Sequence, residues 1–346
     1  MKSSDQVFGQ FPDGRSVRLF TLETAGGLRL SVTNYGGIIT SIRMPDRQGR
    51  SDEIIAGFPL LAPYLGDHPY FGTITGRYAN RIAMGRFTLE GTTWQLPLNS
   101  PPSHLHGGPG GFHTRLWDYS IIKEADEINL RLSYLSPHLE EGYPGNLGVV
   151  VTYTLKETNE FLITYQAETD ASTHLNLTNH AYFNLGGFRG NIFDHQVMVD
   201  ANHYLELSGE LLPTGKMIPV EGTPFDYRPG PGPMDKIRGP LDYCFVLNRG
   251  HSLDYPAAVL YHPESGRRLS LYCTQPGIQV YTANFLDGSL KGHGGIAYGK
   301  HQAVCLETQH FPDSPNHPEF PSTLLRPGET YLHQSRFLFE TDLKNQ

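Results

Sequence analysis

Cysteine is scarce in this sequence. The 346 residues contain only Cys244, Cys273 and Cys305, an odd number of thiols that lie far apart and form no Cys-x-x-Cys pair. A disulfide framework needs paired cysteines, and a thiolate metal site needs closely spaced ones. Neither is expected to organise this protein, and we interpret the three residues as buried or spectator thiols.

Long apolar runs and blocks of positive charge are also missing. No run of ~18 or more apolar residues could span a bilayer. The 27 Lys and Arg residues against 35 Asp and Glu residues give a formal net charge of −8. Binding to a phosphate backbone or to an anionic membrane needs clustered basic side chains. We therefore expect no nucleic-acid partner and no membrane partner, and the sequence does not define the oligomeric state.

The first residues lack the apolar stretch of a signal peptide. A secretory signal carries about 7 to 15 apolar residues after a basic start, whereas residues 1–16 read MKSSDQVFGQFPDGRS. We expect a soluble protein with a cytoplasmic location.

Glycine and proline, in contrast, are abundant. With 38 Gly and 26 Pro, turn signals divide the chain into short segments and leave little room for long helices. Several segments alternate apolar and polar side chains, as half-buried antiparallel strands do. The apolar faces are Leu130, Leu132 and Tyr134; Val149, Val151, Tyr153 and Leu155; and Phe161, Ile163, Tyr165 and Ala167. These patterns predict an all-β fold.

Polar turns join such segments into hairpins. Residues 156–160 interrupt the alternating stretch Val149–Ala167, and a second turn separates Ala257–Tyr261 from Arg268–Cys273. Fixed-period repeats and low-complexity linkers are not apparent. We therefore predict a single domain over residues 1–346, built by local antiparallel pairing.

Two segments are long, rich in glycine and proline and poorly periodic, namely Pro101–Gly111 and Phe225–Gly239. Loops of this kind in a compact sheet protein often carry binding groups. They can equally be plain surface excursions, and the sequence leaves both interpretations open.

Residues 175–185, LNLTNHAYFNL, place polar side chains at alternate positions. In a strand, one face would carry Leu175, Leu177, Ala181, Phe183 and Leu185, and the other Asn176, Thr178, His180, Tyr182 and Asn184. A solvated face normally carries Lys, Glu and Arg, so this row predicts the wall of a polar cleft. A lone histidine is commonly structural, but the ordinary imidazole pKa of ~6.5 also suits His180 to proton transfer at an ether oxygen.

The segment Ala303–Phe311 predicts a second strand of interest. Glu307 shares a face with Cys305 and Gln309, which is an apolar setting for a carboxylate. Burial there would raise the carboxyl pKa above its ordinary value of ~4.3 and make the group a better base. The alternative is an exposed glutamate on an edge strand.

Two further segments concentrate polar groups. In residues 76–82, GRYANRI, a guanidinium can fork onto vicinal hydroxyls or a developing oxyanion, and the asparagine can both donate and accept. In residues 103–108, SHLHGG, His104 and His106 would share a face in an extended chain. A metal site is the obvious interpretation, but the spacing implies no third ligand, so we do not expect one.

Taken together, these segments resemble the aldose 1-epimerase (galactose mutarotase) family. The matches follow the family's order and span nearly the whole chain. They are GRYANRI (76–82), HLHGG (104–108), NLTNHAYFNL (176–185), LDYCFVL (241–247), PGIQVYTANF (276–285) and LETQHFPDS (306–314). The resemblance implies the large antiparallel β-sandwich of that family, a supersandwich with an open sugar-binding cleft.

The resemblance also implies roles for individual residues. Glu307 is similar to the family's general base and His180 to its general acid. His106 is similar to a second histidine that helps to hold and protonate the ring oxygen. The positions that match sugar-binding residues of the family are Asn80, Arg81, Asp242 and Gln279.

The function that this resemblance implies is the interconversion of the α and β anomers of a free aldohexose such as galactose or glucose. It would need no cofactor and no metal. A neutral monosaccharide partner agrees with the lack of a Gly-rich nucleotide loop. Tyr243 stands after Asp242 where the family often has histidine, which bears on sugar preference. Two alternatives stay open: a glycoside hydrolase that uses Glu307 and Asp242 as its carboxylates, and a non-catalytic carbohydrate-binding sandwich.

Overall fold

The computed structural model describes residues 1–228, 234–249 and 252–342. Strands dominate these residues, and the pairings between strands within them are antiparallel. The all-β prediction is confirmed. No helix among the described residues has the length and apolar character that crossing a membrane requires.

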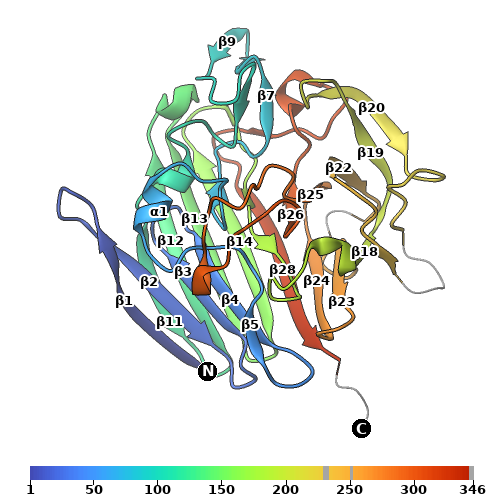
Figure 1. Ribbon diagram of the computed structural model, residues 1–346. Helices are drawn as coiled ribbons and strands as arrows, with labels where there is room; N and C mark the ends of the chain where they lie inside the picture. The colour runs from blue at the N-terminus through green and yellow to red at the C-terminus, as the bar shows by residue number, and fades with distance from the viewer. Residues whose placement is uncertain (229–233, 250–251, 343–346) are drawn as a thin grey trace.

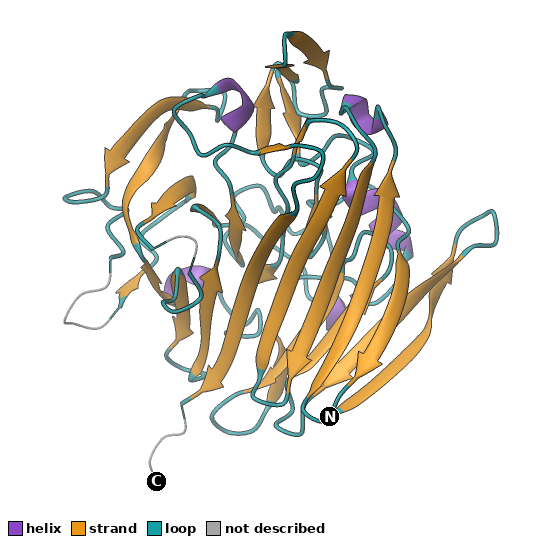
Figure 2. Ribbon diagram, turned by 180° about the vertical axis from the view of Figure 1, so that it is seen from behind, coloured by secondary structure: helices purple, strands orange, loops and turns teal. Residues whose placement is uncertain are grey.

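Nine strands form the largest sheet of the described residues, which we call the large sheet (Figure 2). Its order is β11 (Asp118–Lys123), β12 (Glu127–Ser136), β13 (Leu147–Lys156), β14 (Glu160–Thr169), β28 (Tyr331–Thr341), β24 (Arg267–Cys273), β23 (Ala258–His262), β18 (Gln196–Val199) and β21 (Asp235–Lys236). Short polar turns join β11 to β12 and β13 to β14, and a longer segment, residues 137–146, joins β12 to β13, so these four strands are neighbours in chain order. Both predicted hairpins lie in this sheet, as β13–β14 and β23–β24.

The alternation in the sequence corresponds to burial in the large sheet. The predicted inward-facing side chains have almost no exposed surface, apart from the partly exposed Tyr134. They are Leu130, Leu132, Val149, Val151, Tyr153, Leu155, Phe161, Ile163, Tyr165 and Ala167. Full burial of one large apolar side chain stabilises a fold by roughly 1.5–3 kcal/mol. This face therefore supplies much of the main core.

A second layer is formed by the N-terminal sheet, in which five strands of the described residues pair in chain order (Figure 1). They are β1 (Lys2–Gln10), β2 (Ser16–Glu23), β3 (Arg29–Thr33), β4 (Ile39–Pro45) and β5 (Ser51–Glu53). Phe20 and Val32 of this sheet belong to the same buried cluster as Leu130 and Val151 of the large sheet. The two sheets therefore pack face to face as a sandwich.

The third sheet, called the cavity sheet, has six strands within the described residues. Its order is β17 (Tyr182–Phe183), β26 (Val304–Gln309), β25 (Gly277–Tyr281), β22 (Asp242–Leu247), β19 (Ala201–Leu207) and β20 (Pro213–Pro219). Ile278, Val280 and Leu306 join the main core. Because side chains alternate along a strand, Gln279 and Glu307 point to the opposite face.

Short elements connect the three sheets. The strands are β6 (Ile74–Thr75), β7 (Arg81–Ala83), β8 (Arg86–Leu89), β9 (Thr92–Gln95), β10 (Ser103–Leu105), β15 (Thr173–His174), β16 (Thr178–Asn179) and β27 (Leu324–Leu325). The helical turns are α1 (Ala62–Leu65), η1 (Phe112–Thr114), η2 (Glu140–Gly142), η3 (Ile192–Asp194), η4 (His293–Gly295) and η5 (Ser314–Asn316). Pairing of β7 with β10 and of β6 with β16 brings distant segments together next to the cavity sheet.

Residues 175–185 do not form the continuous strand that their alternation suggests, and of their polar row only His180 and Tyr182 line the cavity described below. The segment is broken into β16 and β17, and both of its faces are buried. Asn176 donates to the carbonyl oxygens of Ala79 and His310, and Asn184 donates to the carbonyl of Gln302. These asparagines satisfy backbone groups between layers instead of forming a cleft wall.

Two other expectations concern cysteines and loops. The three cysteines are free and buried, as interpreted from their spacing. The segment Pro101–Gly111 contains β10 and contributes His106 to the cavity described below. The segment Phe225–Gly239 contains β21, and its residues 229–233 lie outside the described residues.

Candidate active site

A cavity of about 770 Å³, counted out to its opening, lies against the cavity sheet. Every residue that the sequence assigned to the site lines it, namely Asn80, Arg81, His106, His180, Asp242, Gln279 and Glu307. The topology explains this convergence, because Asp242, Gln279 and Glu307 stand on the adjacent strands β22, β25 and β26. Asn80, Arg81 and His106 come from the ends of the paired strands β7 and β10, and His180 lies between β16 and β17. The cavity is thus a concave site with a small set of converging polar side chains.

Three adjacent strands present the acidic side of the cavity. Glu307 on β26 pairs in register with Gln279 on β25, and the Gln279 side chain donates a 2.7 Å hydrogen bond to Oδ1 of Asp242 on β22. Glu307 is only 2% exposed. Burial, and secondarily the charge of Asp242, raises the pKa of Glu307 well above its ordinary value. The predicted desolvation of this carboxylate is confirmed.

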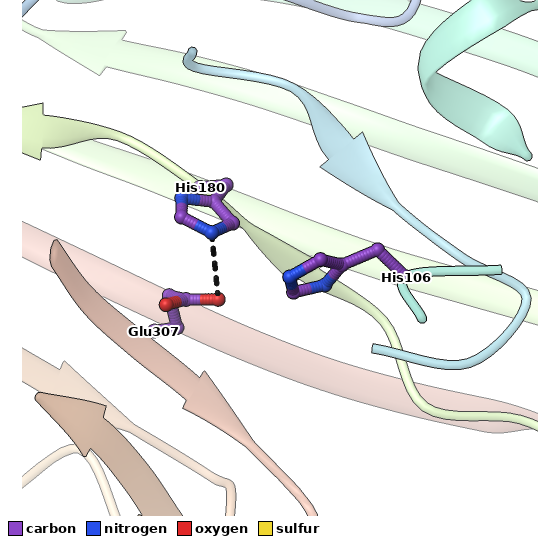
Figure 3. A group of neighbouring side chains, drawn as sticks. All are labelled: His106, His180 and Glu307. Atoms are coloured by element: carbon purple, nitrogen blue, oxygen red, sulfur yellow. Dashed lines mark ion pairs between the residues drawn. The ribbon is translucent and has the colours of Figure 1, made fainter. Parts of the chain in front are cut away.

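His180 faces Glu307 across the cavity. Its Nε2 lies 3.6 Å from Oε2 of Glu307 (Figure 3). The imidazole stacks against the rings of Tyr182 and Tyr70, with centroids 5.0 and 6.1 Å away. Burial lowers the pKa of His180 to about 3. Stacking fixes the plane of the ring, so that Nε2 is held toward the carboxylate.

The pKa shifts of His180 and Glu307 have the same cause. Loss of water penalises the imidazolium form of His180 and the carboxylate form of Glu307 alike. An acid and a base this close hold one proton between them, and the position of that proton responds to whatever enters the cavity. Such a pair can take a proton from one oxygen of a ligand and give one to another.

Two hydrogen bonds join His106 and Asn80 beside His180. The backbone N–H of His106 donates to the carbonyl of Asn80 at 3.0 Å, and the backbone N–H of Asn80 donates to Nδ1 of His106 at 3.2 Å. The rings of His106 and His180 meet edge to face at 5.0 Å. Arg81 follows directly, and its guanidinium donates to the Ser100 hydroxyl at 3.1 Å.

Several residues of the cavity wall have backbone conformations that L-residues seldom adopt. Tyr70, Asn80, His106 and Leu211 have φ values of +58°, +65°, +50° and +59°. Each such residue costs free energy, of order 1 kcal/mol or more, and persists only where its surroundings impose it. Other described residues, such as Met84, Glu90 and Asn159, share this conformation outside the cavity. The four left-handed residues therefore shape the local wall but do not by themselves indicate a ligand.

His106, His180 and Glu307 also place ligand atoms within 4.8 Å of one another, close enough to suggest a metal site. The contact with Asn80 argues against this. A metal on Nδ1 of His106 would displace the Asn80 N–H, and a metal on Nε2 would move the ring proton to Nδ1, where it would oppose that same N–H. We therefore assign the group no resident metal.

Arg77 and Arg81 have different surroundings in the structure, although both belong to the same sequence motif. Arg77 is buried and donates to Oγ of Ser136 and to the carbonyl oxygens of Ser136, Pro137 and Pro144. Burial lowers the pKa of Arg77 to about 10. Arg77 is a structural cation, and only Arg81 reaches the cavity.

His104 and His106 do not act together, contrary to the shared face expected of an extended His-x-His segment. Nδ1 of His104 contacts the Pro97 carbonyl at 2.7 Å, and its Nε2 contacts the Tyr143 hydroxyl at 2.8 Å. The left-handed backbone of His106 turns its side chain into the cavity instead.

Most of the aromatic and apolar part of the cavity wall was not predicted from the sequence. These residues include Tyr70, Leu207, Leu211, Tyr281, Phe285 and Pro312. Tyr281, Phe285 and Pro312 lie inside the motifs already noted, so their proximity to site residues was an available signal. Tyr182, which belongs to the polar row of residues 175–185, lines the cavity. No pattern marks Tyr70, Leu207 or Leu211. Tyr243 packs against Tyr204 and Phe225 and does not line the cavity.

Comparison with known proteins gives consistent results. The aldose 1-epimerase family matches residues 18–338. The chain is 46% identical to galactose mutarotase of Sus scrofa over 341 residues, which covers 96% of this chain and 97% of that protein. It is 34% identical to aldose 1-epimerase of Escherichia coli, with 95% and 96% covered.

Solved structures agree with the sequence comparisons. An aldose epimerase homologue from C. elegans superposes with a TM-score of 0.85 at 28% identity, covering 93% of this chain and 98% of that one. Galactose 1-epimerase from Lactobacillus acidophilus superposes with a TM-score of 0.84 at 26% identity, covering 98% and 99%.

The two arginines of the motif should behave differently when replaced by lysine. Arg77→Lys cannot satisfy the same set of buried acceptors and should lower the free energy of unfolding by about 2–4 kcal/mol. Arg81→Lys, at the cavity wall, is the matched control and should change it by less than about 1 kcal/mol. Urea denaturation at neutral pH measures both, and equal losses would show that Arg77 is not the structural cation.

His104 should make the fold sensitive to acid. Burial lowers the pKa of His104 to about 4, so the unfolded chain binds a proton below pH ~6.5 that the folded chain refuses. Stability is therefore full above that pH and is lost as pH falls toward 4. Between pH 7 and pH 5, His104→Gln should lose about 2 kcal/mol less unfolding free energy than the wild type. Urea denaturation at the two pH values tests this, and an identical loss in both proteins would contradict it.

Proposed function

Because the chain belongs to the aldose 1-epimerase family, it is an isomerase that interconverts the α and β anomers of aldoses, and we propose that free aldohexoses, galactose and glucose foremost, are its substrates. We further propose that Glu307 is the general base and His180 the general acid. The observation that carries this assignment is the 3.6 Å approach of two buried, oppositely shifted titratable groups inside one open cavity.

The chemistry needs only proton transfers. Glu307 removes the proton from the anomeric hydroxyl while His180 gives a proton to the ring oxygen, and the bond between C1 and O5 breaks to give the open aldehyde. Rotation about C1–C2 presents the other carbonyl face. On closure, His180 takes its proton back from the attacking hydroxyl, and Glu307 returns its proton to the carbonyl oxygen.

Four polar side chains are proposed to hold the sugar, namely Asn80, Arg81, Asp242 and Gln279. Oε1 of Gln279 has no hydrogen-bond partner among the described residues, so it can accept from a hydroxyl. The Arg81 guanidinium has donors beyond the one that contacts Ser100. Hydroxyl groups both donate and accept, which matches this mixed set.

The apolar wall suits the other side of a pyranose. Leu207, Leu211 and Pro312 line the cavity with Phe285. Phe285 is 74% exposed, and its ring stacks on that of Tyr281 with the centroids 6.1 Å apart. The C–H groups of a sugar ring form an apolar face that such a surface can cover. The site therefore orients a ring with one polar edge toward Glu307 and His180.

The two alternative functions are not favoured. The relatives are named galactose mutarotase and aldose 1-epimerase. Asp242, which would be the second carboxylate of a hydrolase, accepts a hydrogen bond from Gln279. A binding module would not need a buried acid beside a buried base. That residues 1–346 act as one domain, and that the location is cytoplasmic, remain predictions from the sequence.

Replacing Glu307 by glutamine should remove the base without changing its size. Catalysed mutarotation should fall by about 10²–10⁴-fold, measured as the decay of optical rotation of fresh α-D-galactose and α-D-glucose. Glu124→Gln, at an exposed position, is the matched control and should keep wild-type rates. If Glu307→Gln kept the wild-type rate, the assignment of the base would be wrong.

His180→Asn should separate an enzyme from a binding module. Turnover should fall as far as in Glu307→Gln, with less than about tenfold change in galactose affinity, because the imidazole supplies a transferred proton more than ground-state binding. Polarimetry and calorimetric titration give the two quantities. Loss of affinity with turnover intact would contradict the role of His180, and release of sugar from a galactoside by the wild type would support the hydrolase.

A further inference from the structure

The hydrogen bonds of the Asn99 side chain are fixed by the backbone of Leu105. The backbone N–H of Leu105 donates to Oδ1 of Asn99 at 2.7 Å, and Nδ2 of Asn99 donates to the Leu105 carbonyl at 2.9 Å. A backbone N–H only donates and a carbonyl only accepts, so the two ends of the Asn99 amide cannot exchange places. One amide hydrogen of Asn99 then remains for another partner.

That partner is the hydroxyl of Tyr70. Nδ2 of Asn99 lies 3.3 Å from the Tyr70 hydroxyl oxygen. An amide nitrogen only donates, so Tyr70 must accept this hydrogen bond, and its own O–H hydrogen points elsewhere. Within residues 1–228, 234–249 and 252–342, that hydrogen has no acceptor. Burial raises the pKa of Tyr70, so the hydroxyl keeps its proton at neutral pH.

Tyr70 stands in the wall of the cavity, on the side of the two histidines. It lines the cavity together with Arg81. Its ring lies against those of His106 and His180, with centroids 4.7 and 6.1 Å away. The backbone N–H of Thr73 donates to the Tyr70 carbonyl at 3.2 Å and helps to hold the left-handed turn there, where φ is +58°. The unpaired O–H hydrogen therefore belongs to a well-anchored group beside the acid and the base.

The segment that holds Tyr70 also holds Arg81. Asn99 binds the Tyr70 hydroxyl, and the next residue, Ser100, accepts from the Arg81 guanidinium at 3.1 Å. Arg81 is close enough for its charge to act on the Tyr70 hydroxyl. Gln279, in contrast, presents the unpaired acceptor Oε1 from the cavity sheet. Tyr70 and Arg81 thus supply donors that complement this acceptor, which suits a ligand with several hydroxyl groups.

We propose that Tyr70 is a further substrate-binding residue, whose hydroxyl donates a hydrogen bond to one sugar hydroxyl other than the anomeric one. The inference rests on the proposed function of the site and adds a specificity contact to it. Glu307 and His180 act on the anomeric hydroxyl and the ring oxygen, so the Tyr70 proton is left for the hydroxyl on C2, C3, C4 or C6. A sugar that lacks this hydroxyl leaves the donor unpaired and should be a poorer substrate.

Tyr70→Phe removes the hydroxyl and keeps the ring that packs against the histidines. With D-galactose, kcat/KM should fall about three- to tenfold. The loss should appear chiefly in KM, because the contact is made in the ground state and in the transition state alike. Tyr119→Phe, on β11 and outside the cavity, is the matched control and should leave both constants unchanged. Polarimetry at varied sugar concentration gives kcat and KM for each protein.

Deoxy sugars show whether the lost hydroxyl touches the substrate. The wild type and Tyr70→Phe are compared with the 2-, 3-, 4- and 6-deoxy derivatives of D-galactose. The substitution should reduce kcat/KM for all but one of them, as it does for galactose. The remaining derivative should be insensitive, because a hydrogen bond that already lacks its sugar hydroxyl cannot be lost a second time. An equal loss with every derivative, or no loss with galactose, would overturn the proposal.

Failure of the proposed function would be visible separately. If the wild type does not accelerate mutarotation of galactose, that function fails, and calorimetric titration with the same sugars still measures the contact. Tyr70→Phe should then raise the Kd of galactose about three- to tenfold and leave the Kd of one deoxy derivative unchanged. A galactose Kd that the substitution does not alter, or no binding of galactose to the wild type, would overturn the proposal independently of activity.

Discussion

The burial of Glu307 and His180 at one cavity, with 3.6 Å between Oε2 and Nε2, is the constraint on which the surrounding structure depends. Taking an ionisable group out of water costs several kcal/mol, and that cost is sustained only by a rigid frame. Glu307 stands on β26, which is hydrogen-bonded along its length to β25. The backbone that carries its carboxylate is therefore fixed by the sheet.

The histidine side of the cavity is held differently. Where β26 is a regular strand, His180 lies between two very short strands, β16 and β17, and is fixed by the rings of Tyr70 and Tyr182. Two buried asparagines of the same segment bind backbone carbonyls: Asn176 donates to those of Ala79 and His310, and Asn179 to those of Gly72 and Thr73. Irregular backbone at this depth needs such partners for its polar groups. Most polar residues near His180 thus hold the backbone around the site in place, and few of them line the cavity.

This difference explains which parts of the structure could be predicted from the sequence. Strands of the large sheet follow a period-two pattern with one face in the core, so local alternation predicted β12 to β14 and both hairpins. Glu307 was recognised for a different reason, its apolar setting in the sequence, and β26 is indeed buried along its whole length. The segment around His180 was predicted as a single strand because its alternation is real in sequence, but both faces are covered by other layers, and only tertiary packing decides that.

The site residues themselves came mainly from the resemblance to a family and not from periodicity. Motif letters cannot tell Arg77 from Arg81, or His104 from His106, because each pair shares a residue type and a neighbourhood. The left-handed turns at Asn80 and His106 make the distinction, and they depend on the pairing of β7 with β10. The apolar wall was missed because Leu207 and Leu211 reach the cavity from the β19–β20 hairpin, far away in sequence.

A buried acid–base pair suits this reaction because the proposed cycle consumes no proton. Glu307 returns to the sugar the proton that it removes, and His180 recovers the one that it gives, so neither group must exchange with solvent between turnovers. An enzyme with a net proton transfer would need a path from such a cavity to water. Here the same burial that raises the pKa of Glu307 and lowers the pKa of His180 narrows the difference in proton affinity between them and the sugar oxygens. Deep burial of Glu307 and His180 is therefore compatible with turnover. The apolar wall contributes to catalysis because it helps to keep both groups buried.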